Sequence, residues 1–395
     1  MGLNETHSSN RIHIGFFGRR NAGKSSVVNA VTGQNLSVVS DVLGTTTDPV
    51  YKAMELLPMG PVMIIDTAGI DDEGELGKLR IEKTEQVLIK TDVAVLVVDA
   101  EKELSFEDKS LIEKFKERNI QYIIAYNKSD LKAVKLIQEN EILVSAKSGE
   151  GINELKEKIA ALATTDKKER RIVGDLINKG DFILLVTPID EAAPKGRLIL
   201  PQQQTIRDIL DSDAYVIVVK ETGIKDAIEK FSPSMVICDS QVFDIANREV
   251  PDEIRLTSFS ILMARYKGNL KSAVRSASEF DMLQDGDAIL ISEGCTHHRQ
   301  CNDIGTVKLP KLIRKYTNKE IDFEFTSGGE FPADLSKYKL IVHCGGCMLN
   351  ENEMQYRYKN ARENNVPITN YGMAIAYMNG IIKRSVKVFD ELKEM

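Results

Sequence analysis

The sequence predicts an α/β protein with three domains. Short apolar runs alternate with amphipathic or loop stretches along nearly the whole chain, which is typical of strands connected by helices. With 395 residues, the chain is also too long for one ordinary hydrophobic core and should fold as two or three domains. A glycine-rich motif between the first apolar run and the first helical stretch predicts that the first domain binds a nucleotide.

The first predicted domain, residues 1–168, contains the apolar runs of a five-stranded sheet. Helical or loop stretches separate these runs, so we expect a doubly wound arrangement. The charged stretch 165–171 (TDKKERR) predicts a linker or an exposed helix start and sets the first domain boundary. The apolar runs cover residues 12–17, 62–65, 93–98, 122–126 and 142–144.

The second and third predicted domains, residues 169–255 and 256–395, continue the alternation of strands and helices. In the second domain no chemical motif stands out, and Cys238 lies inside an apolar run, where a buried structural thiol is expected. We interpret this domain as a structural unit that serves dimerisation. The third domain is predicted to begin with a long amphipathic helix near Leu256.

The composition disfavours nucleic acid and membrane as partners. The net charge is −7 and the pI is about 5.5, so the chain as a whole does not attract polyanions. No apolar run approaches the roughly 20 residues that a membrane span requires. Four of the five cysteines fall in two tight groups near the C-terminus. This pattern favours metal ligation over disulfides and predicts a reducing, cytoplasmic compartment.

Residues 18–25 (GRRNAGKS) match the phosphate-binding loop G-x-x-x-x-G-K-[ST], between a predicted strand and a predicted helix. The glycines let backbone N–H groups surround a phosphate at a helix N-terminus. Lys24 is expected to neutralise the β- and γ-phosphate oxygens, and the Ser25 hydroxyl is expected to bind Mg²⁺. The nucleotide contacts predicted in this loop are Asn21, Ala22, Gly23, Lys24, Ser25 and Ser26.

Two further motifs are expected to sense the γ-phosphate. Asp66-Thr-Ala-Gly69 follows the strand VMII, where Asp66 can hold Mg²⁺ through water and the Gly69 N–H can meet the γ-phosphate. The segment 44–48 (GTTTD) lies between the phosphate-binding loop and the Asp66 strand. We interpret it as a switch loop in which Thr46 is the second protein ligand of Mg²⁺.

Two motifs near the end of the first domain predict recognition of guanine. Asn127-Lys-Ser-Asp130 follows the strand YIIAY, and Asp130 can accept two hydrogen bonds from guanine N1 and N2, which adenine does not supply. Ser145-Ala-Lys147 follows EILV and is expected to pack on the base from the other side. The predicted base contacts are Asn127, Lys128, Asp130, Ser145, Ala146 and Lys147.

The predicted fold is therefore a P-loop GTPase domain followed by two smaller α/β domains. Residues 10–160 resemble the Era-like and tRNA-modification branch of the small GTPases. Ras-like members carry a water-positioning glutamine where this chain has Ile70. The resemblance implies that Asn21 helps to hold K⁺, and that Glu75 lies near the position of a water-bridging glutamate. The predicted catalytic residues are Lys24, Thr46, Gly69 and Glu75, with GTP or GDP, Mg²⁺ and K⁺ as cofactors.

A group of cysteines and histidines follows two strands of the third domain. Cys295-Thr-His297 follows the strand DAILI, and His343-Cys344-Gly-Gly-Cys347 follows YKLIV. Because parallel α/β sheets bind ligands at the carboxyl ends of their strands, the three thiols are expected to converge. Cys347 is also expected to open the next helix, whose dipole lowers a thiol pKa. The spacing suits a zinc or iron–sulfur site, a redox pair or unligated thiols.

Over essentially the whole chain, these cysteine groups joined to a GTPase domain resemble the HydF family, the maturation GTPases of [FeFe]-hydrogenase. The resemblance implies that Cys295, Cys344 and Cys347 bind a [4Fe-4S] cluster. It leaves His297 and His343 as candidates for the fourth ligand. Residues close enough in sequence to compete for that position are His298, Cys301 and Asp303.

The HydF resemblance also implies a function and partners. The protein is expected to be a cytoplasmic, homodimeric scaffold or carrier for a diiron subcluster, made with two radical-SAM maturases and passed to the [FeFe]-hydrogenase apoenzyme. The alternative is an RNA-binding GTPase of ribosome assembly or tRNA modification with a structural zinc. The acidic pI and the lack of a basic, aromatic-rich stretch count against it. A third hypothesis is a redox enzyme that uses Cys344 and Cys347.

Overall fold

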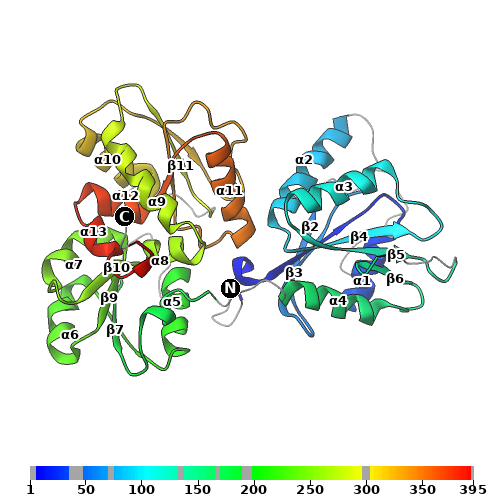
Figure 1. The fold of residues 1–395 in the computed structure, drawn as a ribbon, viewed down its shortest axis with the longest axis horizontal. Helices are drawn as coiled ribbons and strands as arrows, with labels where there is room; N and C mark the ends of the chain where they lie inside the picture. Colours follow the sequence, from blue (N-terminus) through cyan, green and yellow to red (C-terminus); the bar gives the residue numbers. More distant parts are fainter. Residues whose placement is uncertain are drawn as a thin grey trace. The chain divides into compact units, whose positions relative to one another are not determined.

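The computed structural model describes residues 6–34, 48–69, 75–131, 138–164, 170–188, 198–295 and 303–392. The chain forms two compact units, residues 1–168 and residues 169–395. Each unit combines β-sheets with flanking helices (Figure 1). This architecture confirms the predicted α/β fold.

The first unit is built on a six-stranded sheet with the order β2-β3-β1-β4-β5-β6. Neighbouring strands are parallel, except that β2 runs antiparallel to β3. The strands are β1 (Ile12–Phe17), β2 (Val50–Leu56), β3 (Gly60–Asp66), β4 (Val93–Asp99), β5 (Gln121–Asn127) and β6 (Glu141–Leu143). The helices are α1 (Lys24–Thr32), α2 (Glu75–Lys90), α3 (Phe106–Glu117) and α4 (Ile152–Thr164).

Two apolar cores cover the faces of this sheet. One core packs α1 and α4 against the sheet through residues such as Val27 and Ile159, and the other packs α2 and α3 through Val87 and Phe115. The same pairs of helices lie on opposite faces in Figure 1. β4 is buried along its whole length, as expected for a parallel strand covered on both faces. The sheet therefore presents the carboxyl ends of its parallel strands at one edge.

The second unit contains two parallel four-stranded sheets, with the orders β10-β9-β7-β8 and β12-β11-β13-β14. The strands are β7 (Phe182–Val186), β8 (Tyr215–Val219), β9 (Met235–Cys238), β10 (Arg255–Ser258), β11 (Ala288–Ser292), β12 (Asp322–Thr326), β13 (Leu340–His343) and β14 (Ile368–Asn370). The α-helices are α5 (Leu200–Leu210), α6 (Ile224–Phe231), α7 (Phe243–Glu249), α8 (Phe259–Tyr266), α9 (Leu270–Ser276), α10 (Leu309–Thr317), α11 (Glu351–Glu363), α12 (Tyr371–Met378) and α13 (Ile382–Val386). Shorter helical turns include η2 (Gly174–Leu176), η4 (Ser240–Val242) and the π-helical turn η6 (Ile304–Lys308).

The two sheets of the second unit share one topology. In each, the first strand pairs with the second on one side and with the third on the other, and the fourth strand pairs with the third. The fourth strand then leads directly into a helix that its own last residue caps, Ser258 before α8 and Asn370 before α12. After these helices, α9 packs against β14 and α13 against β10. The two halves thus share one strand topology, and α13 at the end of the second half packs against β10 of the first.

The position of β10 bears on the predicted boundary between the second and third domains. Arg255–Ser258 is an edge strand of the first sheet, at the place where the sequence predicts the start of a long helix. The strand has only four residues, too few to show the alternation that identifies strands. We propose that the boundary lies between α8 and α9, near residue 269.

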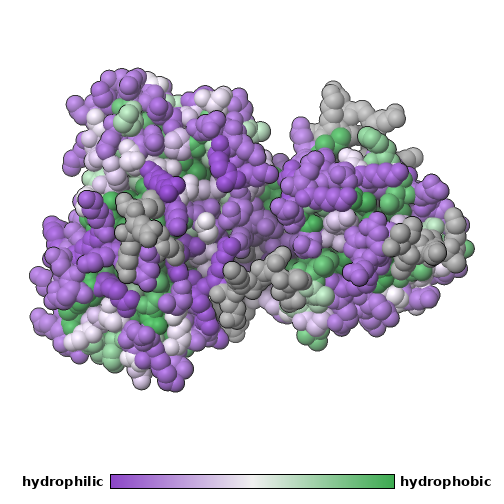
Figure 2. All heavy atoms as spheres, viewed as in Figure 1, coloured by the Kyte–Doolittle hydropathy of each residue, from purple (hydrophilic) through white to green (hydrophobic). Residues whose placement is uncertain are grey.

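No helix in the described part of the chain is long and apolar enough to cross a membrane. On the face shown in Figure 2, hydrophilic side chains cover most of both units, and hydrophobic ones occur in smaller separate areas. The large apolar side chains are concentrated in the cores of the two units.

Candidate nucleotide and cysteine sites

The phosphate-binding loop connects β1 to α1, as its sequence predicts. Gly23 precedes the first residue of α1 and has a positive φ of 82°. A Cβ atom added at Gly23 would lie 2.2 Å from Nδ2 of Asn127. Only glycine therefore fits this position, both because of its backbone conformation and because of the close approach. Asn21 also has a positive φ, 61°, so the loop turns sharply just before the helix.

One carboxylate organises the two phosphate-loop side chains that are expected to bind phosphate and Mg²⁺. Lys24 Nζ donates a hydrogen bond to Asp66 Oδ1 at 2.7 Å. The Ser25 hydroxyl donates to Asp66 Oδ2 at 2.9 Å. Asp66 is the last residue of β3 and is buried, with 7% exposure. The structure therefore brings together three of the predicted nucleotide-site residues from two separate motifs.

Asn127 connects the phosphate-binding loop to the base-recognition loop. Its Nδ2 donates to the Ala22 carbonyl at 3.0 Å, and its Oδ1 accepts a hydrogen bond from Ala146 N at 3.0 Å. The Ser145 hydroxyl donates to Asp130 Oδ1 at 2.7 Å, which orients the carboxylate that is expected to read guanine. These contacts join five predicted residues from three loops into one hydrogen-bonded frame.

Lys128 is held by a residue that motif matching did not single out. Its Nζ donates to Asp99 Oδ2 at 2.6 Å, at the carboxyl end of β4. Burial alone raises the pKa of Asp99, but the hydrogen bond from Lys128 and further contacts outweigh it and hold the pKa below its usual value. Asp99 therefore stays ionised and fixes the Lys128 side chain. A single acidic residue at the end of an apolar run is too common a pattern to reveal this role.

For several predicted nucleotide-site residues, the described part of the chain shows no contact that bears on the predicted role. Thr46 and Ile70 lie outside the described residues, and Glu75 is described only as the first backbone position of α2. Ser26 lies in the first turn of α1, and Gly69 follows Asp66 on a partly exposed loop. Lys147 is exposed after β6. The roles assigned to these residues from the sequence stay predictions.

The cysteine loops follow neighbouring strands of the second sheet in the second unit. β11 and β13 pair in parallel, with Ser292 opposite His343 at their carboxyl ends. The backbone N–H of Gly294 donates to Cys344 Sγ at 3.0 Å, and that of Gly346 donates to it at 3.4 Å. The chain segment that carries Cys295 therefore touches the Cys344 sulfur directly. This edge lies between the strands where the chain order reverses, the usual ligand position in such sheets.

The expectation that Cys347 opens the next helix is wrong. α11 begins at Glu351 and is capped by Asn350, so no helix dipole acts on Cys347. Burial, followed by the neighbouring Cys344, raises the pKa of the Cys347 thiol to about 12, although Lys267 opposes the shift. Burial also raises the pKa of Cys344, against the two backbone N–H donors. Both thiols are therefore protonated at neutral pH unless a metal replaces the proton.

His343 is held by hydrogen bonds at both of its ring nitrogens. Nε2 lies 2.9 Å from Arg357 Nη1, which can only donate, so Nε2 accepts and Nδ1 donates to the Cys344 carbonyl at 2.7 Å. Burial, together with the positive Arg357, lowers the pKa of His343 to about 3. His343 is therefore a neutral imidazole with both nitrogens engaged. It cannot bind iron in this arrangement unless it gives up the hydrogen bond from Arg357.

Sequence reasoning missed several buried polar residues around these loops. Glu293 directly follows β11 and is 4% exposed, and the Tyr371 hydroxyl donates to its Oε1 at 3.2 Å. Lys267 and Arg357 are also buried, with 4% and 2% exposure. Lys267 and Arg357 lie in ordinary helical patterns, so only their burial identifies them.

The three cysteines do not form a complete ligand set in the structure. Within the described ranges, no three histidine, cysteine, aspartate or glutamate side chains are grouped so that they could hold a metal ion. His297 lies outside these ranges, as do His298 and Cys301. Asp303 caps η6, since its side chain accepts from Thr306 N at 2.8 Å.

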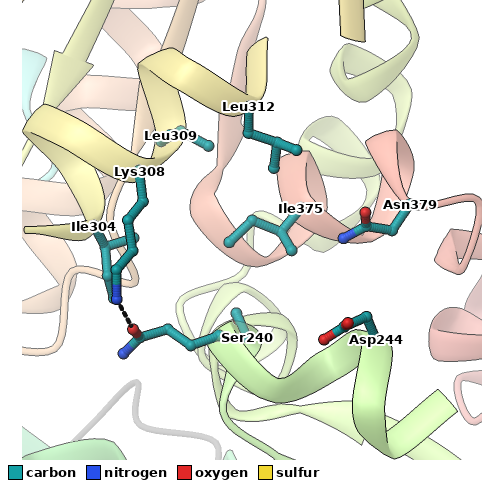
Figure 3. A pocket seen from close by; sticks show the side chains of 9 residues that line it. Ser240, Asp244, Ile304, Lys308, Leu309, Leu312, Ile375 and Asn379 are labelled. Carbon is teal, nitrogen blue, oxygen red and sulfur yellow. Dashed lines mark hydrogen bonds between the residues drawn. The ribbon is translucent and has the colours of Figure 1, made fainter. Parts of the chain in front are cut away.

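A pocket of about 370 Å³ lies in the second unit (Figure 3). Residues that follow β9 form one wall, and side chains from η6, α10 and α12 form the other. Two of its lining residues are joined by a hydrogen bond, which Lys308 Nζ donates to Gln241 Oε1 at 2.6 Å. None of the described candidate residues lines this pocket, so it belongs to neither the nucleotide site nor the cysteine site.

Comparison with protein-family models divides the chain in three. Residues 13–128 match the model of the 50S ribosome-binding GTPases. Together with the phosphate-loop geometry, this match defines a P-loop GTPase domain, and it assigns GTP hydrolysis and binding of GTP, GDP and Mg²⁺ to that domain. Residues 172–268 match the hydrogen maturase F dimerization domain, and residues 271–388 match the hydrogen maturase F tetramerization domain. The chain belongs to the hydrogen maturase F (HydF) family and carries oligomerisation domains.

Individual curated relatives match part of the chain. The tRNA modification GTPase MnmE of Clostridioides difficile is 37% identical over 154 residues, which are 37% of this chain and 33% of that protein. GTPase Der of Wolinella succinogenes is 36% identical over 188 residues, or 42% of this chain and 39% of that protein. The chain thus spans about a third to two fifths of the length of these curated relatives. A crystal structure of Aquifex aeolicus Era bound to GDP and aluminium fluoride is 18% identical, with a TM-score of 0.36, and covers 55% of this chain and 97% of that one.

Proposed function

We propose that the protein is a cytoplasmic GTPase that carries an iron–sulfur precursor for [FeFe]-hydrogenase. The observation that carries this proposal is the pair of cysteine loops on adjacent strands of the second unit, in a chain of the hydrogen maturase F family. The similarity to the tRNA modification GTPase of Clostridioides difficile extends over 37% of the chain, whereas the hydrogen maturase F models match residues 172–268 and 271–388, so we favour the hydrogenase-directed function for that part of the chain.

The chemistry of the cysteine site supports an iron–sulfur cluster. Cys295, Cys344 and Cys347 supply thiols, the ligands that such clusters use. Backbone N–H donors point at the Cys344 sulfur, and donors of this kind stabilise anionic sulfur. When bound, the cluster supplies one-electron chemistry and an iron with an exchangeable ligand. A diiron cargo made by two radical-SAM maturases would attach at this exchangeable position, for which His297 is a candidate ligand.

The nucleotide domain provides the switch. Asp66 holds Lys24 and Ser25, which place a positive charge at the β- and γ-phosphates and a hydroxyl at Mg²⁺. Thr46 and Gly69 complete the contacts to Mg²⁺ and the γ-phosphate, and Glu75 orients the attacking water. Asn21 would help to hold K⁺, which would spread the negative charge of the transition state, since Ile70 stands where Ras-like GTPases carry a glutamine. GTP turnover then controls docking and release of partners.

The proposed dimer interface lies on the first sheet of the second unit. β8 is an edge strand, whereas α13 packs against β10 at the other edge. Exposed apolar side chains lie along and beside β8, including Tyr215 at 57% and Val218 at 42% exposure. Because residues 172–268 match a dimerization domain, we propose that two copies join through β8 and extend the sheet.

Transfer of cargo to the hydrogenase tests the proposed function. The wild-type protein, loaded with iron and sulfide and then incubated with the two radical-SAM maturases, should activate purified [FeFe]-hydrogenase apoenzyme, which is measured as hydrogen evolution. Cys344→Ala should abolish this activation while GTP hydrolysis is retained. Cys238→Ala is the matched control, because Cys238 is a buried thiol of the other sheet, where it donates a hydrogen bond to the Thr257 carbonyl. Equal activation by wild type and Cys344→Ala would contradict the proposal.

A further inference from the structure

A buried arginine ties together the two strands that carry the cysteine loops. Arg357 projects from α11 and is 2% exposed. Its Nη1 donates to the Ser292 hydroxyl at 3.0 Å and to His343 Nε2 at 2.9 Å, and its Nη2 donates to the Gly328 carbonyl at 2.6 Å. Ser292 and His343 are the last residues of β11 and β13 and lie opposite each other. Gly328 in turn donates from its N–H to the Cys295 carbonyl at 3.3 Å.

Arg357 is a buried cation beside the cysteine loops. Its hydrogen-bond partners are a hydroxyl, an imidazole and a carbonyl. Two nearby groups favour its protonated form, first the ionised Cys344 thiol and then Glu353 of the same helix. Because a buried cation is costly without negative charge near it, Arg357 suits a site that holds anionic sulfur, and it favours the Cys344 thiolate in return.

A second buried cation, Lys267, lies beside the loop that carries the other thiol, Cys347. Lys267 follows α8 of the neighbouring half, is 4% exposed, and donates from Nζ to the Leu349 carbonyl at 2.9 Å. Its positive charge favours the ionised form of Cys347. Gln355 of α11 donates to the Lys267 carbonyl at 2.7 Å, which holds this segment against the cysteine loop. Each described cysteine of the C-x-x-C pair therefore has its own buried cation.

We propose that Arg357 and Lys267 are the positioning and countercharge residues of the cysteine site, and that together they set the reduction potential of the iron–sulfur cluster bound there. The inference rests on the proposed function. A cluster held by three thiolates is anionic overall and gains a further negative charge on reduction. Two fixed cations in a buried, low-dielectric site therefore stabilise the reduced form more than the oxidised form. Arg357 also holds both cysteine loops in register through its three hydrogen bonds.

Reduction potentials of charge variants test the inference. Each protein is reconstituted anaerobically with iron and sulfide and titrated with dithionite and redox mediators, while the reduced cluster is followed by electron paramagnetic resonance. In Arg357→Gln, the ratio of reduced to oxidised cluster at a fixed potential should fall at least about tenfold. For a one-electron couple, this corresponds to a reduction potential that is about 59 mV more negative. Lys267→Met should shift the potential in the same direction. Arg357→Lys keeps the charge and should stay close to wild type.

The control is Arg384→Gln. Arg384 makes four hydrogen bonds to Asn247, Val250 and Pro251, none of them in a cysteine loop, and this variant should keep the wild-type potential. A loaded Arg357→Gln variant with an unchanged potential would overturn the inference. If that variant folds poorly or takes up no iron, an unchanged potential in Lys267→Met overturns it instead. Wild-type protein that binds no iron would overturn the proposed function itself.

Discussion

At the scale of the residue, one carboxylate and one side-chain amide connect the motifs of the nucleotide site. Asp66 fixes Lys24 and Ser25, and Asn127 bridges two loops that are far apart in sequence. Each of these contacts joins one sequence motif to another. Substitutions here should therefore affect GTP binding through several motifs at once.

Asn21 gives a prediction about monovalent cations. If this asparagine helps to hold K⁺ beside the phosphates, GTP hydrolysis should be on the order of tenfold to a hundredfold faster in K⁺ than in Na⁺ at equal ionic strength. Asn21→Ala should remove the difference. Asn119→Ala is the matched control, since Asn119 also has a positive φ, 54°, but lies at the end of α3. Steady-state phosphate release measures the rates, and equal wild-type rates in the two salts would rule out the K⁺ role.

Asp175 gives a prediction about pH. The hydrogen bond from Arg265, 2.9 Å long from Nη1, holds the pKa of Asp175 below its usual value of 3.8, although burial opposes the shift. The carboxylate therefore stabilises the fold at pH values above its unfolded pKa, and this contribution is lost as the pH falls through the lower, folded pKa. Asp175→Asn should lower the free energy of unfolding by about 0.5 to 1 kcal/mol at pH 7.

Urea unfolding of the wild type and Asp175→Asn at pH 7 and at pH 3 measures this effect. The difference between the two proteins should shrink at the lower pH. A difference of the same size at both pH values would show that the ion pair is not its source.

Motif residues were predictable from the sequence, while their supporting residues were not. The phosphate loop and the cysteine loops each follow a strand at a fixed spacing, so their positions could be derived before the structure was known. Arg357 and Asp99 act through burial and through partners distant in sequence. No local pattern distinguishes them from ordinary surface charges.

At the scale of the element, the exposed strand β8 predicts the dimer interface. Val218→Lys should place like charges opposite each other across a β8 pair and raise the dimer dissociation constant at least about tenfold, or about 1.4 kcal/mol. Leu57→Lys in the GTPase unit is the control, because Leu57 is 82% exposed. Sedimentation velocity across a concentration series measures the constant. A Val218→Lys protein that dimerises like wild type would exclude β8 as the interface.

Elements with strong periodicity could be predicted, and edge or short elements could not. The buried strands β1, β3, β4 and β5 stand out as apolar runs. β2 is exposed along most of its length, so it lacks such a run, and the sequence predicts five strands where the sheet has six. β10 is short and leads directly into α8, so the sequence pattern did not reveal this strand.

At the scale of the whole molecule, both halves of the second unit contribute residues to the surroundings of the cysteine loops. Lys267 follows α8 of the first half and donates to the Leu349 carbonyl, next to the cysteine loop of the second half. The alternation of strands and helices does not predict this contact, because it depends on long-range packing and not on local pattern. This contact links the half that matches a dimerization domain to the cysteine loops.

The central claim is that this chain holds an iron–sulfur cluster on three cysteines separately from its nucleotide site. Anaerobic reconstitution followed by iron and sulfide analysis tests it most directly. We expect a brown protein with about four irons per chain, and a Cys344→Ala variant that loses them yet still hydrolyses GTP. A colourless wild-type protein that binds zinc, or no metal, would contradict it.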